Sequence, residues 1–435
     1  MKGKVRLKMN SGLSDKDFCV QKIQSAISLV QRLLDGDYPH RDSEKALQRI
    51  LTVYQQDQKL LESLDDTAQT DTVLEYCRRA NINLVRFKVF LGLLLRSSNL
   101  RNAFELYFPI KILASELLET KPAVVLSSEW NFSPFTYPVA LPELPEFIFI
   151  GIPASESENP LILPLAGHEL GHVVWRRKGA KQEFDPVIRS RIVQLYRDRW
   201  TEFTSRFDVG TLTSDRLETD LFLSRIWGQS YRIAQRQLEE VFCDFMGLYI
   251  FGQSFLHSFR YLLAPSLGQY RAVTYPRLRD RARYLTILAD RYKLSEIADY
   301  SNSFSEQDPT LSPNDIFILQ IADDTTEQLY LLLFDLIEKF HGKAEKFDTG
   351  TTSEVFAKQC LMNLVPAASI KSVAAVINAA WSIRLNLNDW NILGEIEDTS
   401  KRRIEKLRVL RDLVLKSLEV YEYHKRLEKD AIKRD

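Results

Sequence analysis

The sequence predicts a mainly α-helical protein in which helical bundles flank a small core of mixed α and β structure. Over most of the 435 residues, apolar side chains recur at intervals of three and four positions, which is the spacing of amphipathic helices. One region, 121–164, lacks this spacing and is instead rich in proline, with two short apolar runs typical of strands. The chain is too long for one compact domain, and we expect three regions, 1–120, 121–290 and 291–435.

Both terminal regions are expected to be helical. In the N-terminal region, the helical spacing of apolar residues covers 18–34, 45–64 and 71–95. The C-terminal region ends in a long charged helix with one apolar stripe, which consists of Ile404, Leu407, Leu410, Val414, Leu418 and Tyr421. We expect this stripe to pack against the body of the protein, and self-association through the same helix is the alternative.

The central region, 121–290, is expected to form the mixed core with a short edge sheet. The runs Ala123–Leu126 and Phe147–Ile152 predict two short strands between turns. Pro153 directly follows the second run and favours an edge position for it, because proline cannot donate a hydrogen bond to a neighbouring strand. Helical spacing resumes after these strands, and a helical insertion is expected at about 179–235.

The overall composition narrows the class of protein. Hydrophobic residues make up 45% and charged residues 27%, as in folded rather than disordered proteins. Lys plus Arg and Asp plus Glu each number 58, so the formal charge is zero and we expect no nucleic-acid binding. The four cysteines form no CxxC pair, which is typical of a reducing compartment. Because no secretory signal and no apolar stretch of roughly 18 residues is present, we expect a cytoplasmic protein that does not enter a membrane.

One short segment carries the strongest chemical signal. Residues His168–His172 read HELGH, the HExxH pattern, within a stretch of helical spacing. Positions four apart lie on one face of a helix, so His168 and His172 can bind one metal ion, and zinc is the ion expected. Glu169 lies beside the pair, where it can take a proton from a water molecule at the metal. A pair of histidines on an ordinary helix is the alternative.

A third ligand is expected further along the chain. The extended HExxHxxGxxH pattern is excluded, because Trp175 and Lys178 occupy the positions of its glycine and last histidine. Downstream of the HExxH segment, Glu240 and Asp244 form an ExxxD pair in an apolar stretch. Glu240 can complete a site of two histidines and one glutamate, and Asp244 can accept the free ring N–H of a ligand histidine. Glu239 is the rival third ligand, but the residue four positions after it is a cysteine.

These motifs resemble the gluzincin metallopeptidases, with HELGH followed by E-V-F-C-D, over roughly residues 145–285. The resemblance implies a zinc-dependent peptidase. Its three metal ligands would be His168, His172 and Glu240, and Glu169 would be its general base. Asp244 would orient one of the ligand histidines. In such enzymes the strand before the HExxH helix binds substrate at the edge of the sheet, and Phe147–Ile152 occupies that place in the sequence.

A second segment is similar to a motif of related enzymes. Residues 274–281, TYPRLRDR, resemble the T-H-P-x-x-x-x-R segment of HtpX-like and CAAX-processing metallopeptidases, with Tyr275 in place of the histidine. A tyrosine hydroxyl can donate to an oxyanion, so Tyr275 is a candidate catalytic residue, or else a tyrosine in a turn. Arg281 is expected either to pair with a carboxylate near the metal or to lie on a helix surface. His257 is a weaker candidate oxyanion donor, and a packed or surface position is its alternative.

The function expected from these motifs is zinc-dependent hydrolysis of a peptide bond in a protein or peptide substrate, with one zinc ion per chain. The alternative is a helical interaction protein without catalysis, with or without a structural zinc ion. A third possibility is an enzyme that stays inactive until a partner or ligand moves the insertion at 179–235.

Overall fold

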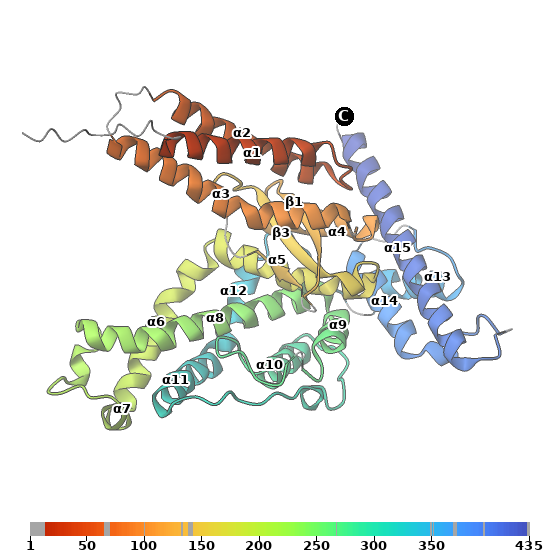
Figure 1. Ribbon diagram of the computed structural model, residues 1–435. Coiled ribbons are helices and arrows are strands. Elements are labelled where there is room, and N and C mark those ends of the chain that lie inside the picture. Colours follow the sequence, from red (N-terminus) through yellow and green to blue (C-terminus); the bar gives the residue numbers. More distant parts are fainter. Residues whose placement is uncertain are drawn as a thin grey trace, which may run out of the picture.

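The computed structural model describes residues 14–64, 70–99, 101–131, 134–137, 142–266, 268–348, 350, 352–368, 372–394 and 396–432. In this part of the chain the protein is mainly α-helical with one small sheet, as the sequence predicts (Figure 1). No helix among these residues combines the length and the apolar character needed to cross a membrane.

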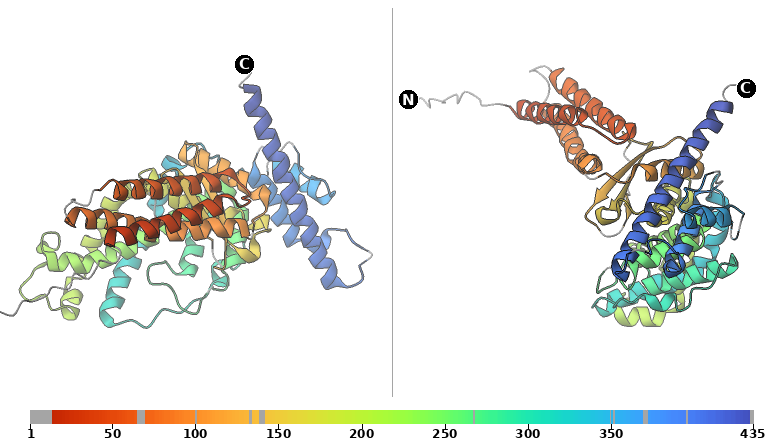
Figure 2. Two further views of the ribbon diagram at one scale, coloured as in Figure 1. Left: turned by 45° about the horizontal axis from the view of Figure 1, so that its top comes forward. Right: turned by 90° about the vertical axis from the view of Figure 1, so that its right-hand side faces the viewer.

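Three N-terminal helices form a layer on one face of the sheet (Figures 1 and 2). They are α1 (Asp15–Leu34), α2 (Arg41–Glu62) and α3 (Thr70–Asn99), which confirms the three helices predicted in this region. The first helix begins with a capping box: the Ser14 hydroxyl accepts from the backbone N–H of Asp17, and the Asp17 carboxylate accepts from that of Ser14 at 2.8 Å. These two bonds satisfy N–H groups that a helix start would otherwise leave without partners.

The sheet contains β1 (Ala123–Glu129), β2 (Phe135–Thr136) and β3 (Phe147–Pro153) in the order β1-β3-β2. Strand β1 runs parallel to β3, and the two-residue strand β2 runs antiparallel to it. The expectation that Phe147–Ile152 is an edge strand is therefore wrong, because β3 is the central strand and β2 lies at the edge. Pro153 is compatible with this position because it is the last residue of β3, beyond the residues that pair with β2.

Both faces of the sheet are buried, each in a different hydrophobic core. Val125 and Phe149 pack with the three N-terminal helices, whereas Val124 and Ile150 pack with the remaining helices. Strands that are covered on both faces lack the polar alternation of a half-exposed sheet. This explains why the sequence of β3 is a continuous apolar run, which by itself does not indicate how many neighbours the strand has.

The second core is the larger one and contains the HExxH segment. Its central helices are α5 (Pro164–Arg177) and α8 (Leu221–Phe251), with α4 (Phe104–Leu118) and α9 (Gln253–Leu263) packed beside them. The predicted insertion forms α6 (Ala180–Asp198), α7 (Trp200–Arg206) and the first half of α8. The remaining α-helices are α10 (Leu278–Arg291), α11 (Pro313–Leu329), α12 (Leu333–Phe340), α13 (Thr352–Met362), α14 (Val373–Leu385) and α15 (Thr399–Ile432). Short 3₁₀ turns lie at Ala154–Glu156, Pro160–Ile162, Ser214–Arg216, Ser301–Ser303, Tyr330–Leu332 and Leu387–Asp389.

The long last helix, α15, lies along one end of the molecule and packs on α4 and α14 (Figure 2). Its stripe is buried at Leu410, Val414, Leu418 and Tyr421, whereas Ile404 remains 64% exposed. Most of the predicted stripe therefore faces the protein itself. Self-association through α15 stays a prediction.

Glycines allow α5 and α8 to approach each other closely. A Cβ atom added at Gly171 would lie 2.9 Å from the Cα of Cys243, and one at Gly167 would lie 3.1 Å from the Cα of Gly247. These contacts are with backbone atoms, which cannot rotate away as a side chain can. The glycine of the HELGH segment therefore sets the distance between the two helices that carry the predicted ligands.

We expect Gly171→Ala to lower the free energy of unfolding by about 1–3 kcal/mol, because the added methyl group overpacks the contact between α5 and α8. Thermal or denaturant unfolding measures this change. Gly228→Ala on α8 is the matched control, because the nearest atom to its added Cβ is Arg232 Nη1 at 3.9 Å. That variant should be stabilised by up to about 1 kcal/mol, since alanine is the better helix former. Equal stability of the two variants would contradict the close contact at Gly171.

Candidate metal centre

The candidate site lies where α5 and α8 pack against each other in opposite directions. His168 contacts Asp244, and one turn further along α5 His172 contacts Glu239 and Glu240. Both helices are buried in this part, so the site is held by two rigid elements within the larger core. The two motifs that the sequence places far apart are thereby brought together.

His168, His172 and Glu240 form a group that could hold a metal ion. Each offers one ligand atom, and these atoms lie within 4.8 Å of one another. The Nε2 atoms of His168 and His172 lie 3.4 and 3.5 Å from the two carboxylate oxygens of Glu240. Ligands about 2.05 Å from a tetrahedral zinc ion are about 3.3 Å apart, so the spacing suits such an ion.

A carboxylate orients each of the two histidines. Asp244 Oδ1 lies 2.8 Å from His168 Nδ1, and Glu239 Oε1 lies 2.9 Å from His172 Nδ1. Because an ionised carboxylate can only accept, each Nδ1 carries a hydrogen, which leaves each Nε2, on the side of Glu240, as the nitrogen that can bind a metal ion. Asp244 thus occupies the position predicted for it, and Glu239, the rival ligand, contacts the far side of a histidine ring instead.

The sequence motifs did not predict that Glu239 orients His172, although the sequence contains one signal for this role. Arg176 follows His172 by one helical turn and lies 2.6 Å from Glu239, and Arg236 lies 3.2 Å from the same carboxylate. A basic residue one turn beyond an HExxH segment can pair with an acid on a facing helix. Which of two adjacent glutamates it meets depends on how the two helices are rotated, and a sequence pattern does not specify that rotation.

Arg281 lies buried against the carboxylates rather than on a helix surface. Its Nε and Nη2 atoms donate to the two oxygens of Asp244, each at 2.7 Å, and Nη2 also lies 3.5 Å from Glu240. Burial raises the pKa of Asp244, but the charge and hydrogen bonds of Arg281 more than offset this and hold the pKa below its usual value. The predicted alternative in which Arg281 pairs with a carboxylate near the metal group is the one observed.

The electrostatics of the site favour a bound cation. Burial lowers the pKa of His168, but Asp244 and Glu240 outweigh that effect and raise the pKa to about 10. Burial also raises the pKa of Glu240, and the neighbouring His172, His168 and Arg281 lower it below the usual range. The carboxylates therefore stay ionised and attract positive charge to the ring nitrogens. A metal ion can supply that charge in place of a proton.

Glu169 is positioned to act on a molecule in the adjoining cleft. It is only 4% exposed, and its Oε2 atom has no hydrogen-bond partner among the residues that the structure describes. A buried carboxylate oxygen is costly to leave without a partner, so this atom is available to a water molecule or a substrate. The Thr136 hydroxyl donates to the backbone carbonyl of Glu169 at 2.8 Å and so ties β2 to α5.

The cleft beside the metal group has a volume of about 580 Å³. Strand β2 contributes Phe135 and Thr136 to its wall, and Tyr275 contributes from the segment before α10. The Tyr275 hydroxyl accepts a hydrogen bond from Arg236 Nη2 at 2.9 Å. His257 is not among the residues that line this cleft, and its ring packs on Trp381 with the centroids 5.4 Å apart.

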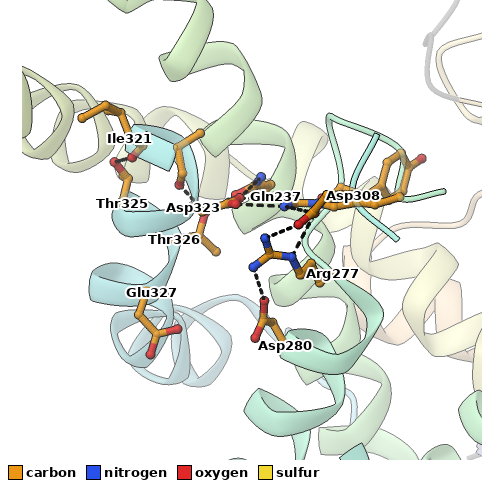
Figure 3. A network of polar contacts seen from close by, with 12 residues as sticks. Gln237, Arg277, Asp280, Asp308, Ile321, Asp323, Thr325, Thr326 and Glu327 are labelled. Carbon is orange, nitrogen blue, oxygen red and sulfur yellow. Dashed lines mark hydrogen bonds and ion pairs between the residues drawn. The ribbon is translucent and has the colours of Figure 1, made fainter. Parts of the chain in front are cut away.

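A polar network holds the backbone of Tyr275 in place. Arg271, buried behind the cleft, donates from Nε to the Tyr275 carbonyl at 2.8 Å and binds Asp323 with its other two nitrogens. Asp323 also accepts from Gln237 on α8, and Gln237 in turn accepts from Thr326 on α11 (Figure 3). The segment before α10 is therefore fixed to both α8 and α11.

The structure thus brings five predicted site residues into one cluster and places the sixth, Tyr275, on the same cleft. The cluster consists of His168, Glu169, His172, Glu240 and Asp244. Together with the mainly α fold, it defines a protein with a buried group of two histidines and one glutamate that opens onto a cleft. Comparison with known proteins found no matching family model, no matching curated protein and no matching solved structure.

Proposed function

We propose that the protein is a zinc-dependent hydrolase that cleaves peptide bonds in a protein or peptide substrate. The observation that carries this proposal is the buried group of His168, His172 and Glu240 directly beside Glu169, whose Oε2 atom lacks a partner among the described residues. The resemblance of both motifs to the gluzincin metallopeptidases supports the same reaction class.

The residues present suit a zinc ion. Two imidazole nitrogens and one carboxylate are a common ligand set of catalytic zinc sites, which keep a fourth position for water or substrate. The spacing of the ligand atoms and the surplus of buried carboxylates support a divalent cation at this position. When bound, zinc would polarise the scissile carbonyl and lower the pKa of a bound water towards about 7.

Glu169 is the general base in this proposal. It takes a proton from the attacking water and passes it to the amine that leaves. Asp244 and Glu239 hold the two histidines in the tautomer that directs both Nε2 atoms towards the metal position. Because Arg236 donates to the Tyr275 hydroxyl, Tyr275 can direct its own proton to the oxygen of the scissile carbonyl.

The substrate is expected to lie along β2 rather than along β3. Strand β2 is at the edge of the sheet, and both of its residues line the cleft. A peptide in an extended conformation can add to a strand edge through backbone hydrogen bonds. In this arrangement the bond to be cleaved lies in the cleft that Thr136 and Glu169 both line.

Metal content and peptide cleavage test the proposal together. We expect purified protein to contain about one zinc ion per chain by elemental mass spectrometry and to cleave members of a complex peptide mixture. A zinc chelator should abolish the cleavage, and added zinc should restore it. Protein that retains zinc and leaves every peptide intact, while a partner protein co-purifies, would instead favour the non-catalytic interaction protein.

A further inference from the structure

The residues that line the cleft change from apolar to basic along α5. Leu165, His168, His172 and Arg176 follow one another at intervals of three and four residues, and all four line the cleft. They lie on one face of the helix, with Leu165 and Arg176 at its two ends. At 1.5 Å per residue these ends are about 16 Å apart, and the metal group lies between them.

The end of the cleft at Leu165 is apolar. Three residues of α9 line it together with Leu165, namely Phe259, Leu262 and Leu263. The guanidinium of Arg281 lies 5.1 Å from the ring of Phe259, and its Nε and Nη2 atoms donate to the carboxylate of Asp244, which balances its charge. This end therefore offers a hydrophobic surface and no charge of its own to a ligand.

The end of the cleft at Arg176 carries an excess of positive charge. Arg176 and Arg236 both line it, and both pair with the single carboxylate of Glu239, at 2.6 and 3.2 Å. Arg236 also lies 2.6 Å from Glu240, a carboxylate that a divalent cation would share. The side chains of Arg176 and Arg236 are 24% and 28% exposed, so they can reach a ligand, whereas Glu239 is turned towards His172.

The same excess follows from the charges around the whole site. Asp244 neutralises Arg281, with which it forms two hydrogen bonds. Glu169 and Glu240 would balance a divalent cation at the metal group. Glu239 is then the only carboxylate paired with Arg176 and Arg236 that the cation would not share, which leaves one positive charge at this end of the cleft. A guanidinium recognises a carboxylate through parallel hydrogen bonds.

We propose that the cleft selects peptides with an apolar side chain at one end and a carboxylate at the other. This inference rests on the proposed function in that the ligand is a peptide. An extended chain advances about 3.3 Å per residue, so the 16 Å between the two ends corresponds to about five residues. The carboxylate is that of an acidic side chain or of a peptide C-terminus, and both sources offer the same chemistry to Arg176 and Arg236.

Binding of defined peptides to the full-length Glu169→Gln protein with added zinc tests this selectivity without relying on turnover. The probes are fluorescent seven-residue peptides with blocked termini. Each contains one Leu and one Glu five positions apart and alanine elsewhere. One probe has Leu before Glu, and the other has Glu before Leu. Matched probes carry Gln in place of Glu, and one of these has a free C-terminal carboxylate. Fluorescence anisotropy gives the affinities, and we expect the carboxylate probes to bind about tenfold more tightly than the neutral ones.

Variants assign the preference to the two arginines. Arg176→Gln and Arg236→Gln should each reduce the preference for the carboxylate severalfold, and Arg176→Lys should keep part of it. Arg260→Gln, on α9 but not among the residues that line the cleft, is the control and should keep all of it. The zinc content of every variant is measured, so that loss of the metal is not mistaken for loss of selectivity.

Equal affinities for the Glu and Gln probes would overturn this inference, and so would a preference that survives in both arginine-to-glutamine variants. Absence of binding by any probe would overturn it as well. The wild-type protein is incubated with the same probes, and cleavage is followed by mass spectrometry. Selective binding without cleavage would count against the proposed hydrolase alone, whereas cleavage without selectivity would count against this inference alone.

Discussion

Replacement of Glu169 by Gln is expected to reduce peptide hydrolysis about 10²- to 10⁴-fold while leaving the zinc content unchanged. Glutamine has nearly the shape of glutamate but cannot take a proton from water. Glu169 is not one of the three residues whose ligand atoms cluster, so its replacement leaves His168, His172 and Glu240 in place. Initial rates on a cleaved peptide, together with elemental mass spectrometry, measure both quantities.

Glu158→Gln is a suitable control for this prediction, because Glu158 is an exposed carboxylate outside the cleft lining. It should have the rate and the zinc content of the wild-type protein. A Glu169→Gln protein that keeps full, chelator-sensitive activity would show that another group acts as the general base. Loss of zinc from that variant would instead place Glu169 among the ligands.

The second large effect concerns the two adjacent glutamates of α8. Glu240→Gln should lower the affinity for zinc by more than about a hundredfold, because it removes a charged ligand. Glu239→Gln should lower it only about 10- to 100-fold, because the amide oxygen can still accept from His172 Nδ1. Titration of zinc against a competing chelator measures both affinities.

This pair of variants distinguishes the ligand from the residue that orients it. At saturating zinc, Glu239→Gln should still bind about one ion per chain, whereas Glu240→Gln should fall well below that. The two substitutions remove the same charge from neighbouring positions on one helix, so each is the control for the other. A reversed order of affinities would make Glu239 the third ligand and would contradict the geometry described above.

Much of the helical architecture could be predicted, because it depends on local periodicity. The HExxH spacing and the ExxxD spacing each place their side chains on one face of one helix, so both groups were accessible from sequence. That they meet depends on the antiparallel packing of α5 against α8, which the resemblance to a known family suggested. The role of Glu239 depends on the rotation of these helices about their axes, which no motif encodes.

The arrangement of the sheet, unlike that of the helices, was only partly predicted from the sequence. The apolar runs of β1 and β3 were correctly predicted as strands. The central position of β3 was not predicted, because Pro153 was interpreted as a sign of an edge strand. The edge strand that borders the cleft, β2, has only two residues, Phe135 and Thr136. A strand of that length has no periodicity to detect, and it exists because Gly151 leaves room for the ring of Phe135 beside the backbone of β3.

Because β3 is buried between the two hydrophobic cores, the stability of each core depends on the other. Val125 and Phe149 are covered by the N-terminal helices, while their neighbours Val124 and Ile150 support the helices that carry the metal group. Removing the N-terminal helices would expose to water an apolar sheet face whose other side packs against the helices of the metal group. The two cores are therefore expected to melt in a single cooperative transition, and a truncated protein without α1, α2 and α3 would be prone to aggregate before the proposed activity could be assayed.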